Sequence, residues 1–387
     1  MGAQHDLQQR EQQEGANGIS LENAETGEDN GGSYSPNGHG ANASLKIDPS
    51  FVVPPEHRPL RAPLTPLSHQ IPVINLSPLT SLVATARESI VSQVGCACQE
   101  WGFFQVMNHG VPQTLIQKLR DEARTFFELP LQKKLEVKRS SNNFLGYNDG
   151  ELTKNVRDWK EVYDMAPGGS FELPADFDSD NHHTLVHANQ WPSFMPSLSI
   201  WPLSTSWHSP FLSLWLRAWD FHHFHEDFKL STTSLFRLNH YPVCPAPELA
   251  LGVSRHKDVG ALTILLQGDV GGLEVKSKNG EWIGVKPNPE AFVINVGDIT
   301  QVYSNDKYRS VEHRVVVNEN KDRYSFPYFF TPAHSVDLAP ITELISDENR
   351  PRYRSFNWGK YLKRRFDSNF KNLGVENLQI SHYSLIA

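Results

Sequence analysis

Leu262-Thr263-Ile264-Leu265-Leu266 and Phe292-Val293-Ile294-Asn295-Val296 are two of the short apolar runs that dominate residues 236–330. Runs rich in β-branched and aromatic side chains, separated by Gly, Asn and Pro, are typical of strands. Many short strands at even spacing favour a barrel or a jelly roll. The other predicted strands of this region are Leu273-Glu274-Val275, Trp282-Ile283-Gly284-Val285, His313-Arg314-Val315-Val316-Val317 and Tyr324-Ser325-Phe326.

Helices are predicted on both sides of this β-rich region. Residues 71–76 and 102–106 are expected to be strands, and residues 81–100 between them have helical spacing. Pro112 opens a second predicted helix, whose apolar residues stand at positions 115, 116, 119, 123, 126 and 127. Near the end, the apolar stripe over residues 356–370 predicts a helix that covers one end of the barrel. The predicted fold class is therefore α+β, mainly β.

The sequence predicts five segments. Residues 1–50 contain few large apolar groups and cannot offset the entropy of ordering, so we expect a disordered, polar and acidic tail. Residues 51–190 form an N-terminal helix and strand region, residues 229–340 the β core, and residues 341–387 a C-terminal helical region. Residues 191–228 are anomalous, because Trp, Ser, Pro and His crowd them and four prolines break any long helix.

The composition favours a small-molecule partner. The net charge is −8 and the pI about 6.1, and no basic run suggests nucleic acid or an anionic membrane surface. Neither a signal peptide nor a membrane-spanning apolar run is recognised. Cys96, Cys98 and Cys244 are too few and too irregular for a disulfide framework, which favours a reducing compartment. We expect a cytoplasmic monomer, with the nucleus as a second location.

One metal-ligand pattern stands within the β-rich region. His256, Asp258 and His313 form a set of two imidazoles and one carboxylate, which can hold non-haem Fe(II) on one face and leave the other face open. Residues i and i+2 of a strand point the same way, so we expect His256 and Asp258 to reach one ion from a strand. The His-x-Asp spacing alone is weak evidence, because the chain has 17 histidines and many acids.

The neighbouring residues strengthen the pattern. Gly297-Asp298 forms a predicted turn ahead of His313, and Arg314 places a charge in a strand of valines, where a charge needs a reason. Arg323 and Ser325 have the spacing and the donor groups to clamp a carboxylate. The alternative for Arg323 is an ordinary surface charge.

These residues, in this order, resemble the plant 2-oxoglutarate- and Fe(II)-dependent dioxygenases, a family that includes flavonol synthase, anthocyanidin synthase, gibberellin oxidases and aminocyclopropane-carboxylate oxidase. The resemblance covers most of residues 70–385 and implies a double-stranded β-helix, or jelly roll, with flanking N-terminal and C-terminal helices. It also implies an enzyme of secondary metabolism. The matching motifs are residues 71–76, Trp101-Gly102-Phe103-Phe104-Gln105-Val106, Asn108-His109-Gly110, Arg237-Leu238-Asn239-His240-Tyr241-Pro242 and Asn295-Val296-Gly297-Asp298.

The resemblance assigns roles to the candidate residues. It implies that His256, Asp258 and His313 bind Fe(II), while Arg323 and Ser325 hold the distal carboxylate of the cosubstrate 2-oxoglutarate (2OG). With O2, the family converts 2OG to succinate and CO2 and hydroxylates or desaturates a small plant metabolite. Ascorbate is the expected reductant.

Further positions are assigned with an alternative left open. Tyr241 and Asn239 match positions that contact or orient the cosubstrate, although Tyr241 would also suit a packed core. The candidates for lining a substrate pocket, all of which could instead serve packing, are Tyr147, Arg237, Phe329 and Thr331.

Two stretches bear on the substrate. Residues 154–164 resemble a less characterised branch of the family, so the resemblance names no substrate. From about residue 194 to residue 225 the chain lacks the long amphipathic helix that the resemblance implies. We hypothesise that a local frame or splice error in the gene produced this segment.

Three other functions were weighed. The lost helix could leave a catalytically silent barrel that still binds metal or ligand. An oxidase like aminocyclopropane-carboxylate oxidase shares the triad and the Arg-x-Ser pair without consuming 2OG, but the long acidic tail does not suggest it. A zinc hydrolase is disfavoured, because no nearby residue supplies both a third ligand and a general base.

Overall fold

The computed structural model describes residues 47–59, 70–80, 84–176, 183–193, 227–228, 232–368 and 378–386. All of them belong to one compact unit, Ala41–Ala387. Most of the expected tail and residues 194–226 of the anomalous segment lie outside the described residues, as does the end of the predicted C-terminal helix.

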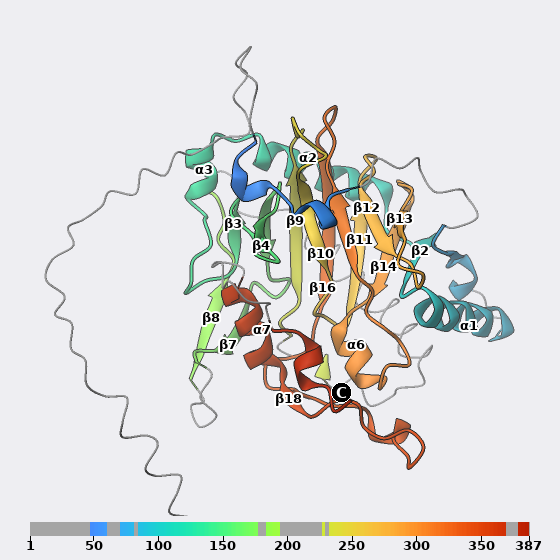
Figure 1. The fold of residues 1–387 in the computed structure, drawn as a ribbon. Helices are drawn as coiled ribbons and strands as arrows, with labels where there is room; N and C mark the ends of the chain where they lie inside the picture. Colours follow the sequence, from blue (N-terminus) through green and yellow to red (C-terminus); the bar gives the residue numbers. More distant parts are fainter. Residues whose placement is uncertain are drawn as a thin grey trace, which may run out of the picture. The chain divides into compact units, whose positions relative to one another are not determined.

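An eight-stranded sheet forms the backbone of the fold (Figure 1). Neighbouring strands are antiparallel throughout, except for the parallel pair at one edge, β1 and β2. The strands, in spatial order, are β1 (Val73–Asn75), β2 (Phe103–Met107), β14 (Ala291–Val296), β11 (Leu262–Gln267), β16 (Arg323–Phe330), β9 (Leu235–Tyr241), β6 (Glu161–Met165) and β3 (Gly146–Asn148).

A four-stranded antiparallel sheet forms the second layer. Its order is β10 (Leu251–His256), β15 (His313–Val316), β12 (Leu273–Lys276) and β13 (Trp282–Gly284). A hydrophobic cluster joins the two sheets, because Phe103, Leu265 and Val293 of the large sheet pack with Leu273 and Val275 of the small one. Two antiparallel sheets packed in this way confirm the predicted jelly roll.

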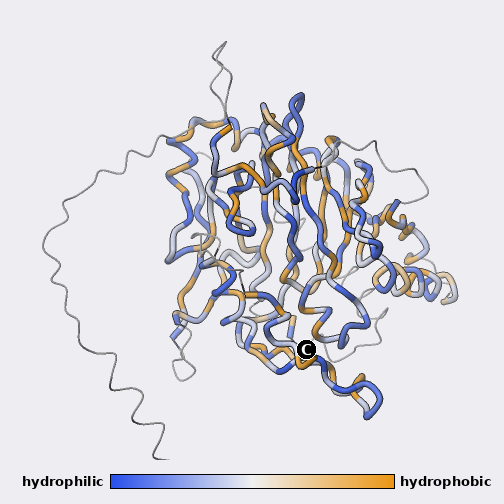
Figure 2. Tube along the Cα trace, in the orientation of Figure 1, coloured by the Kyte–Doolittle hydropathy of each residue, from blue (hydrophilic) through white to orange (hydrophobic). Residues whose placement is uncertain are grey.

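The central strand β11 shows why the sequence forms this sheet. Its six residues are all buried, so both faces of the strand are covered. Leu262, Ile264 and Leu266 belong to the core that also contains the buried residues of the helices, whereas Thr263 and Leu265 line a cavity between the sheets. Strand alternation therefore separates a packing face from a functional face. In Figure 2 hydrophobic residues recur along these central strands.

Helices cover the outer face of the large sheet. Helix α2 (Gln113–Phe127) begins after Pro112 and buries Ile116, Leu119, Ala123, Phe126 and Phe127, which confirms the predicted stripe. The other helices are α1 (Ala84–Glu100), α3 (Leu131–Leu135), α6 (Asp298–Tyr303) and α7 (Trp358–Ser368). In the described part of the chain, no helix is long and apolar enough to cross a membrane.

Several small elements complete the fold and were not individually predicted. They are the hairpins β4 (Leu152–Thr153) with β5 (Val156–Arg157) and β7 (Ser170–Pro174) with β8 (Thr184–Ala188), the pair β17 (Asp337–Leu338) and β18 (Phe356–Asn357), and the 3-10 turns η1 (Pro49–Phe51), η2 (Pro55–His57), η4 (Ser77–Thr80), η5 (Thr342–Leu344) and η6 (Ile380–Tyr383). Helix α7 packs against β7, so the C-terminal helix covers one end of the barrel, as the sequence predicted.

The buried His240 of β9 links two neighbouring segments through a buried carboxylate and an exposed one. Its Nδ1 lies 2.7 Å from Oε1 of Glu161 on β6, and its Nε2 lies 3.2 Å from Oδ2 of Asp322, which precedes β16. The second contact has ion-pair distance without good hydrogen-bond alignment. Burial lowers the pKa of His240, but the two carboxylates outweigh it, so the pKa is raised above its ordinary value.

This raised pKa predicts a pH dependence of stability. A histidine whose pKa is higher in the folded protein contributes stability that is complete below the unfolded pKa of about 6.5 and is lost as the pH rises through the folded pKa. We expect the melting-temperature difference between wild type and the His240→Gln variant to be largest near about pH 6 and to shrink by about pH 9. A difference that stays constant over that range would contradict the charged pairing.

Candidate active site

Strand pairing brings two histidines together at one end of the small sheet. His256 is the last residue of β10 and His313 the first residue of β15, and they stand opposite each other in the antiparallel register. Nδ1 of His256 lies 2.9 Å from the Ser254 carbonyl, and Nδ1 of His313 lies 3.1 Å from the Val311 carbonyl. Each carbonyl accepts a hydrogen bond from Nδ1–H, so in the neutral imidazole Nε2 keeps its lone pair for a metal.

Asp258 completes the group. Its Oδ1 lies 3.5 Å from Nε2 of both histidines, and one potential ligand atom from each residue lies within 4.8 Å of the others. Thr263 Oγ1 and Asn295 Nδ2 donate to the other oxygen, Oδ2, at 2.6 and 2.8 Å. Two hydrogen bonds to one oxygen fix the carboxylate and direct Oδ1 towards the imidazoles.

The charges of the three groups are coupled. Burial alone would raise the pKa of Asp258, but the neighbouring imidazoles outweigh burial and hold that pKa well below its usual range. Burial and the nearby His313 lower the pKa of His256, whereas attraction to Asp258 overcomes burial and raises the pKa of His313. Asp258 is therefore ionised and favours the protonated form of His313. A cation that binds here displaces this proton and meets one carboxylate and two imidazole nitrogens.

The structure corrects one step of the sequence argument. His256 and Asp258 do not share a strand, because β10 ends at His256 and Asp258 lies in the loop beyond it. The predicted Gly297-Asp298 motif holds this loop: the Asp298 N–H donates to the Asp258 carbonyl at 2.8 Å. Gly297 packs so closely on Gly260 that a Cβ at position 297 would lie 2.1 Å from the Gly260 carbonyl oxygen. Asp298 itself begins helix α6.

Arg314, whose charge in a strand of valines needs a reason, finds its partners outside the site. Its Nε donates to Glu274 at 2.7 Å, and its guanidinium stacks on Trp282 with 4.2 Å to the ring centroid. Arg314 lines neither of the two cavities described below. Strand alternation explains this, since neighbouring residues of β15 point to opposite faces of the sheet and His313 takes the inner one.

An inner cavity of about 80 Å³ lies between the sheets beside the triad. Arg323 and Ser325 of β16 line it together with Asn239 and Tyr241 of β9, and Asn239 Nδ2 donates to Ser325 Oγ at 3.3 Å. Four residues that the sequence assigned to a cosubstrate thus meet in one small space.

Arg323 is the unusual member of this cavity. The residue is 1% exposed, and its guanidinium lies over the Tyr241 ring at 4.8 Å. Nη2 lies 3.5 Å from Gln267 Oε1, while Nε and Nη1 form no hydrogen bond with the described residues. Burial lowers the pKa of Arg323. A buried cation without a carboxylate is costly, so these donors fit an anionic ligand.

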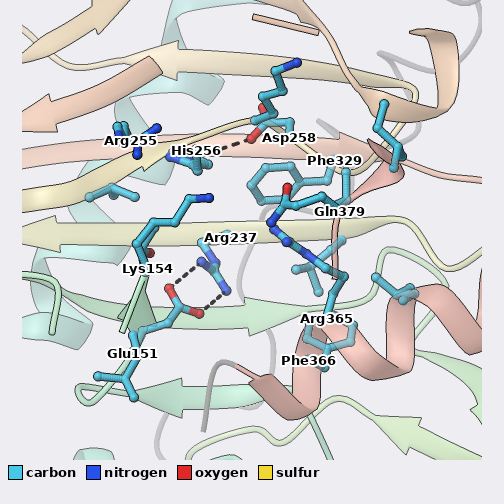
Figure 3. Close-up of a pocket in the computed structure, with 18 of the residues that line it drawn as sticks. Glu151, Lys154, Arg237, Arg255, His256, Asp258, Phe329, Arg365, Phe366 and Gln379 are labelled. Atoms are coloured by element: carbon cyan, nitrogen blue, oxygen red, sulfur yellow. Dashed lines mark hydrogen bonds and ion pairs between the residues drawn. The ribbon is translucent and has the colours of Figure 1, made fainter. Parts of the chain in front are cut away.

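An outer cavity of about 340 Å³ opens next to the inner one (Figure 3). The two share six lining residues, namely Lys160, Arg237, Val253, His256, Asp258 and Phe329. Phe329 and Thr331, two predicted substrate residues, line the outer cavity. The cavity therefore leads directly to the triad.

Arg237 also lines both cavities, but its charge is compensated. Its Nε donates to Asp164 at 2.6 Å, and its Nη1 donates to Glu151 at 2.8 Å, the pair labelled in Figure 3. Lys160 lies 2.7 Å from the same Glu151 and 3.1 Å from Asp158. The wall near Arg237 is thus a network in which cations and carboxylates balance.

The structure corrects the expectation for Tyr147. This residue is 1% exposed and lines neither cavity, and its hydroxyl donates to Glu161 at 2.7 Å. It packs in the core against Phe126, so the packing alternative applies.

Sequence reasoning missed much of the outer cavity. Leu152, Thr153 and Lys154 of the β4–β5 hairpin line it, as do Leu362, Arg365 and Phe366 of α7 and the residues Gln379, Ile380 and Ser381. The one available signal was in α7, where Arg365 places a charge beside the apolar stripe that contains Leu362 and Phe366.

Comparison with known proteins supports the same chemistry. Residues 232–332 match the 2OG-Fe(II) oxygenase superfamily, and residues 71–194 match the N-terminal region described as non-haem dioxygenase in morphine synthesis. The chain is 35% identical to jasmonate-induced oxygenase 2 of Arabidopsis thaliana, covering 80% of this chain and 83% of the relative. It is 34% identical to thebaine 6-O-demethylase of Papaver somniferum, covering 74% and 78%.

A solved structure is similar over the same region. The crystal structure of JOX2 in complex with 2OG, Fe and JA has a TM-score of 0.66 and 33% identity, covering 83% of this chain and 90% of that one. The fold described above therefore occurs in a protein whose crystal structure holds Fe and 2OG.

The carboxylate geometry predicts a graded loss of metal binding. Asp258→Ala removes a ligand, so we expect Fe(II) affinity, measured by anaerobic calorimetry, to fall by more than about 100-fold. Thr263→Val removes one orienting hydrogen bond and is expected to weaken binding by roughly 10-fold. Asp347→Ala, at an exposed carboxylate outside the site, is the matched control. Unchanged affinity in Asp258→Ala would contradict the assignment.

Proposed function

The chain belongs to the 2OG-Fe(II) oxygenase superfamily, and we propose that His256, Asp258 and His313 hold its iron while Arg323 and Ser325 hold 2OG. The enzyme is a 2OG-dependent dioxygenase that oxidises a small metabolite. One observation carries the residue assignment: the guanidinium of Arg323 is buried in the inner cavity next to the triad, with two nitrogens that bind no described residue.

Iron and 2OG, when bound, would activate O2, which is the oxidant, and 2OG would supply two electrons as it is oxidised to succinate and CO2. The protein residues prepare the site for this chemistry. The carbonyls of Ser254 and Val311 fix the two imidazoles, and Thr263 and Asn295 fix Asp258. The donors occupy one side of the metal position and leave the other side open to ligands.

The inner cavity offers hydrogen-bond donors for a carboxylate that is held close to the triad. Arg323 offers a planar fork of N–H donors and Ser325 a hydroxyl, while Asn239 holds the hydroxyl in place. Tyr241 covers the guanidinium with its ring. The intact donor set and the unsatisfied Arg323 favour an active enzyme over a catalytically silent barrel.

The outer cavity accepts the substrate that is to be oxidised. We infer that this substrate is a small, largely apolar molecule with one anionic group. Leu235, Phe329 and Phe366 supply apolar walls, and the lining contains six lysines and arginines but three carboxylates. Asp258 faces the metal, and Arg237 is compensated by its own carboxylates. Among the described residues, no carboxylate lies within ion-pair distance of Lys257 or Arg365. The buried Asp298 attracts both cations from farther away, but burial raises the pKa of Asp298 to about 6.

Arg365 and Lys257 are therefore the residues that receive the anionic group. Figure 3 shows Arg365 reaching from α7 towards Phe329 and Gln379 inside the cavity. Its Nη1 donates to the Leu378 carbonyl at 2.9 Å, which holds the side chain in this direction. The similar proteins are named for different small molecules: one relative is thebaine 6-O-demethylase, and one solved structure is a complex with JA. The carbon skeleton of the substrate is therefore left to experiment.

The remaining properties belong to the same proposal. O2 is the oxidant, the protein acts as a monomer in the cytoplasm, and the reaction is a hydroxylation or a desaturation. Free thiols at Cys96, Cys98 and Cys244 are consistent with a reducing compartment.

Arg323 gives a direct test of the cosubstrate site. Arg323→Lys keeps the charge but loses the bidentate fork, so we expect the KM for 2OG to rise by roughly 10-fold to 100-fold in an assay of succinate release. Arg314→Lys is the matched control, because this arginine is also buried in a strand but pairs with Glu274 outside the cavities. An unchanged KM for 2OG in Arg323→Lys would remove Arg323 from the cosubstrate site.

The substrate class is tested with paired compounds. Plant carboxylic acids and their methyl esters are offered to the iron-loaded enzyme, and substrate-stimulated succinate release is measured. We expect acids to be preferred, and Arg365→Ala to lower the preference by about 10-fold through loss of a charge-assisted hydrogen bond. Arg365→Lys should retain part of it, and the exposed Lys278→Ala all of it. Equal turnover of acids and esters by the wild type would refute an anionic substrate.

A further inference from the structure

Residues 47–58 form an N-terminal strap that lies outside both family matches, the first of which begins at residue 71. The strap is anchored on the barrel. Val53 is 2% exposed, and its N–H donates to the Leu249 carbonyl at 2.9 Å. Arg314 Nη1 donates to the His57 carbonyl at 3.3 Å. Figure 1 shows the strap in blue.

The strap contacts the β4–β5 hairpin, which is part of the outer cavity wall. Each hairpin strand has two residues, and the turn between them places Lys154 and Asn155 at φ of +55° and +61°. This region of φ is unfavourable for residues other than glycine. So short a hairpin is not stable alone in water and needs packing from outside.

Phe51 provides that packing. The Arg157 guanidinium of β5 lies over the Phe51 ring with 4.6 Å to the centroid. The Trp159 ring meets the same ring edge-on, with 4.8 Å between centroids and 61° between planes. Phe51 therefore contacts both the end of the hairpin and the residue that precedes Lys160.

Each partner of Phe51 is in turn fixed to the wall. Arg157 donates from Nε and Nη2 to the Asp149 carbonyl at 3.3 and 3.0 Å, which closes the base of the hairpin. Trp159 Nε1 donates to the Pro242 carbonyl at 3.1 Å, next to Tyr241 of the inner cavity. A shift of the Arg157 guanidinium or of the Trp159 ring would therefore disturb neighbouring residues that line the cavities.

We propose that the N-terminal strap positions the substrate-cavity wall, with Phe51 as the positioning residue that holds Arg157 and Trp159, and through them Leu152, Thr153 and Lys160, in place. The inference rests on the proposed role of the outer cavity as the substrate site. Phe51 touches neither cavity, so it acts only through these partners.

Hydrogen–deuterium exchange on the full-length chain tests the proposal without turnover. In Phe51→Ala we expect amides of residues 152–160 to exchange about 10-fold faster, with unchanged exchange in β11 and β14. Phe51→Tyr should restore protection, and Glu56→Ala, at an exposed strap position, should leave it unaltered. Unchanged exchange at residues 152–160, or an equal rise throughout the chain, would overturn the proposal.

Kinetics provide the second measurement. With the acid preferred in the paired screen, Phe51→Ala should raise the substrate KM by roughly fivefold, because the wall is less well ordered. The KM for 2OG should rise much less, because Arg323 and Ser325 lie on β16 and Lys160, which also lines the inner cavity, is held there by Glu151 and Asp158. An equal rise in both constants, or a rise in neither, would count against a role for Phe51 in the substrate wall. The exchange result stands even if no substrate is found, so the two proposals fail separately.

Discussion

The antiparallel pairing of β10 with β15 is the constraint on which the site depends. It places His256 opposite His313, although they are far apart in the sequence, and it ends where the chain must turn to bring Asp258 to the same point. That turn is held by the Asp298 N–H and by the close approach of Gly297 to Gly260. The large sheet then supplies Thr263 of β11 and Asn295 of β14, which orient the carboxylate. The metal site thus depends on the strand register within the small sheet and on the packing of the large sheet against it.

Charge is handled differently in the two cavities. In the inner cavity Arg323 is buried without a carboxylate, which suits a ligand that brings its own negative charge. Beside it, three cations and three carboxylates compensate one another in a buried network of Arg139, Lys160, Arg237, Glu151, Asp158 and Asp164. This network keeps the wall between the cavities close to neutral. Anions are therefore attracted to Arg323 on one side and to Arg365 and Lys257 on the other.

Local motifs explain how much could be predicted from the sequence. The Arg323-x-Ser325 pair could be predicted because its residues lie two apart on one strand. The triad could be predicted from the order of several motifs, but strand alternation does not apply to it, because Asp258 lies beyond the end of β10 and His313 is far away in the sequence. Tyr147 was a candidate for the substrate pocket because an aromatic residue in a strand does not reveal which face it takes or which partner it meets. The outer cavity could not be predicted, since its walls come from the β4–β5 hairpin, α7 and residues 379–381, which only the tertiary fold brings together.

The neutral network has a consequence for the orientation of a charged substrate. Glu151 accepts from both Nη1 and Nη2 of Arg237 and also pairs with Lys160, so it compensates two cations that border the triad. Its replacement by glutamine would leave three cations against two carboxylates in this network. The inner end of the outer cavity would then compete with Arg365 and Lys257 for an anionic group. The neutrality of this wall therefore supports binding of the anionic group at the α7 end, with the triad itself unchanged.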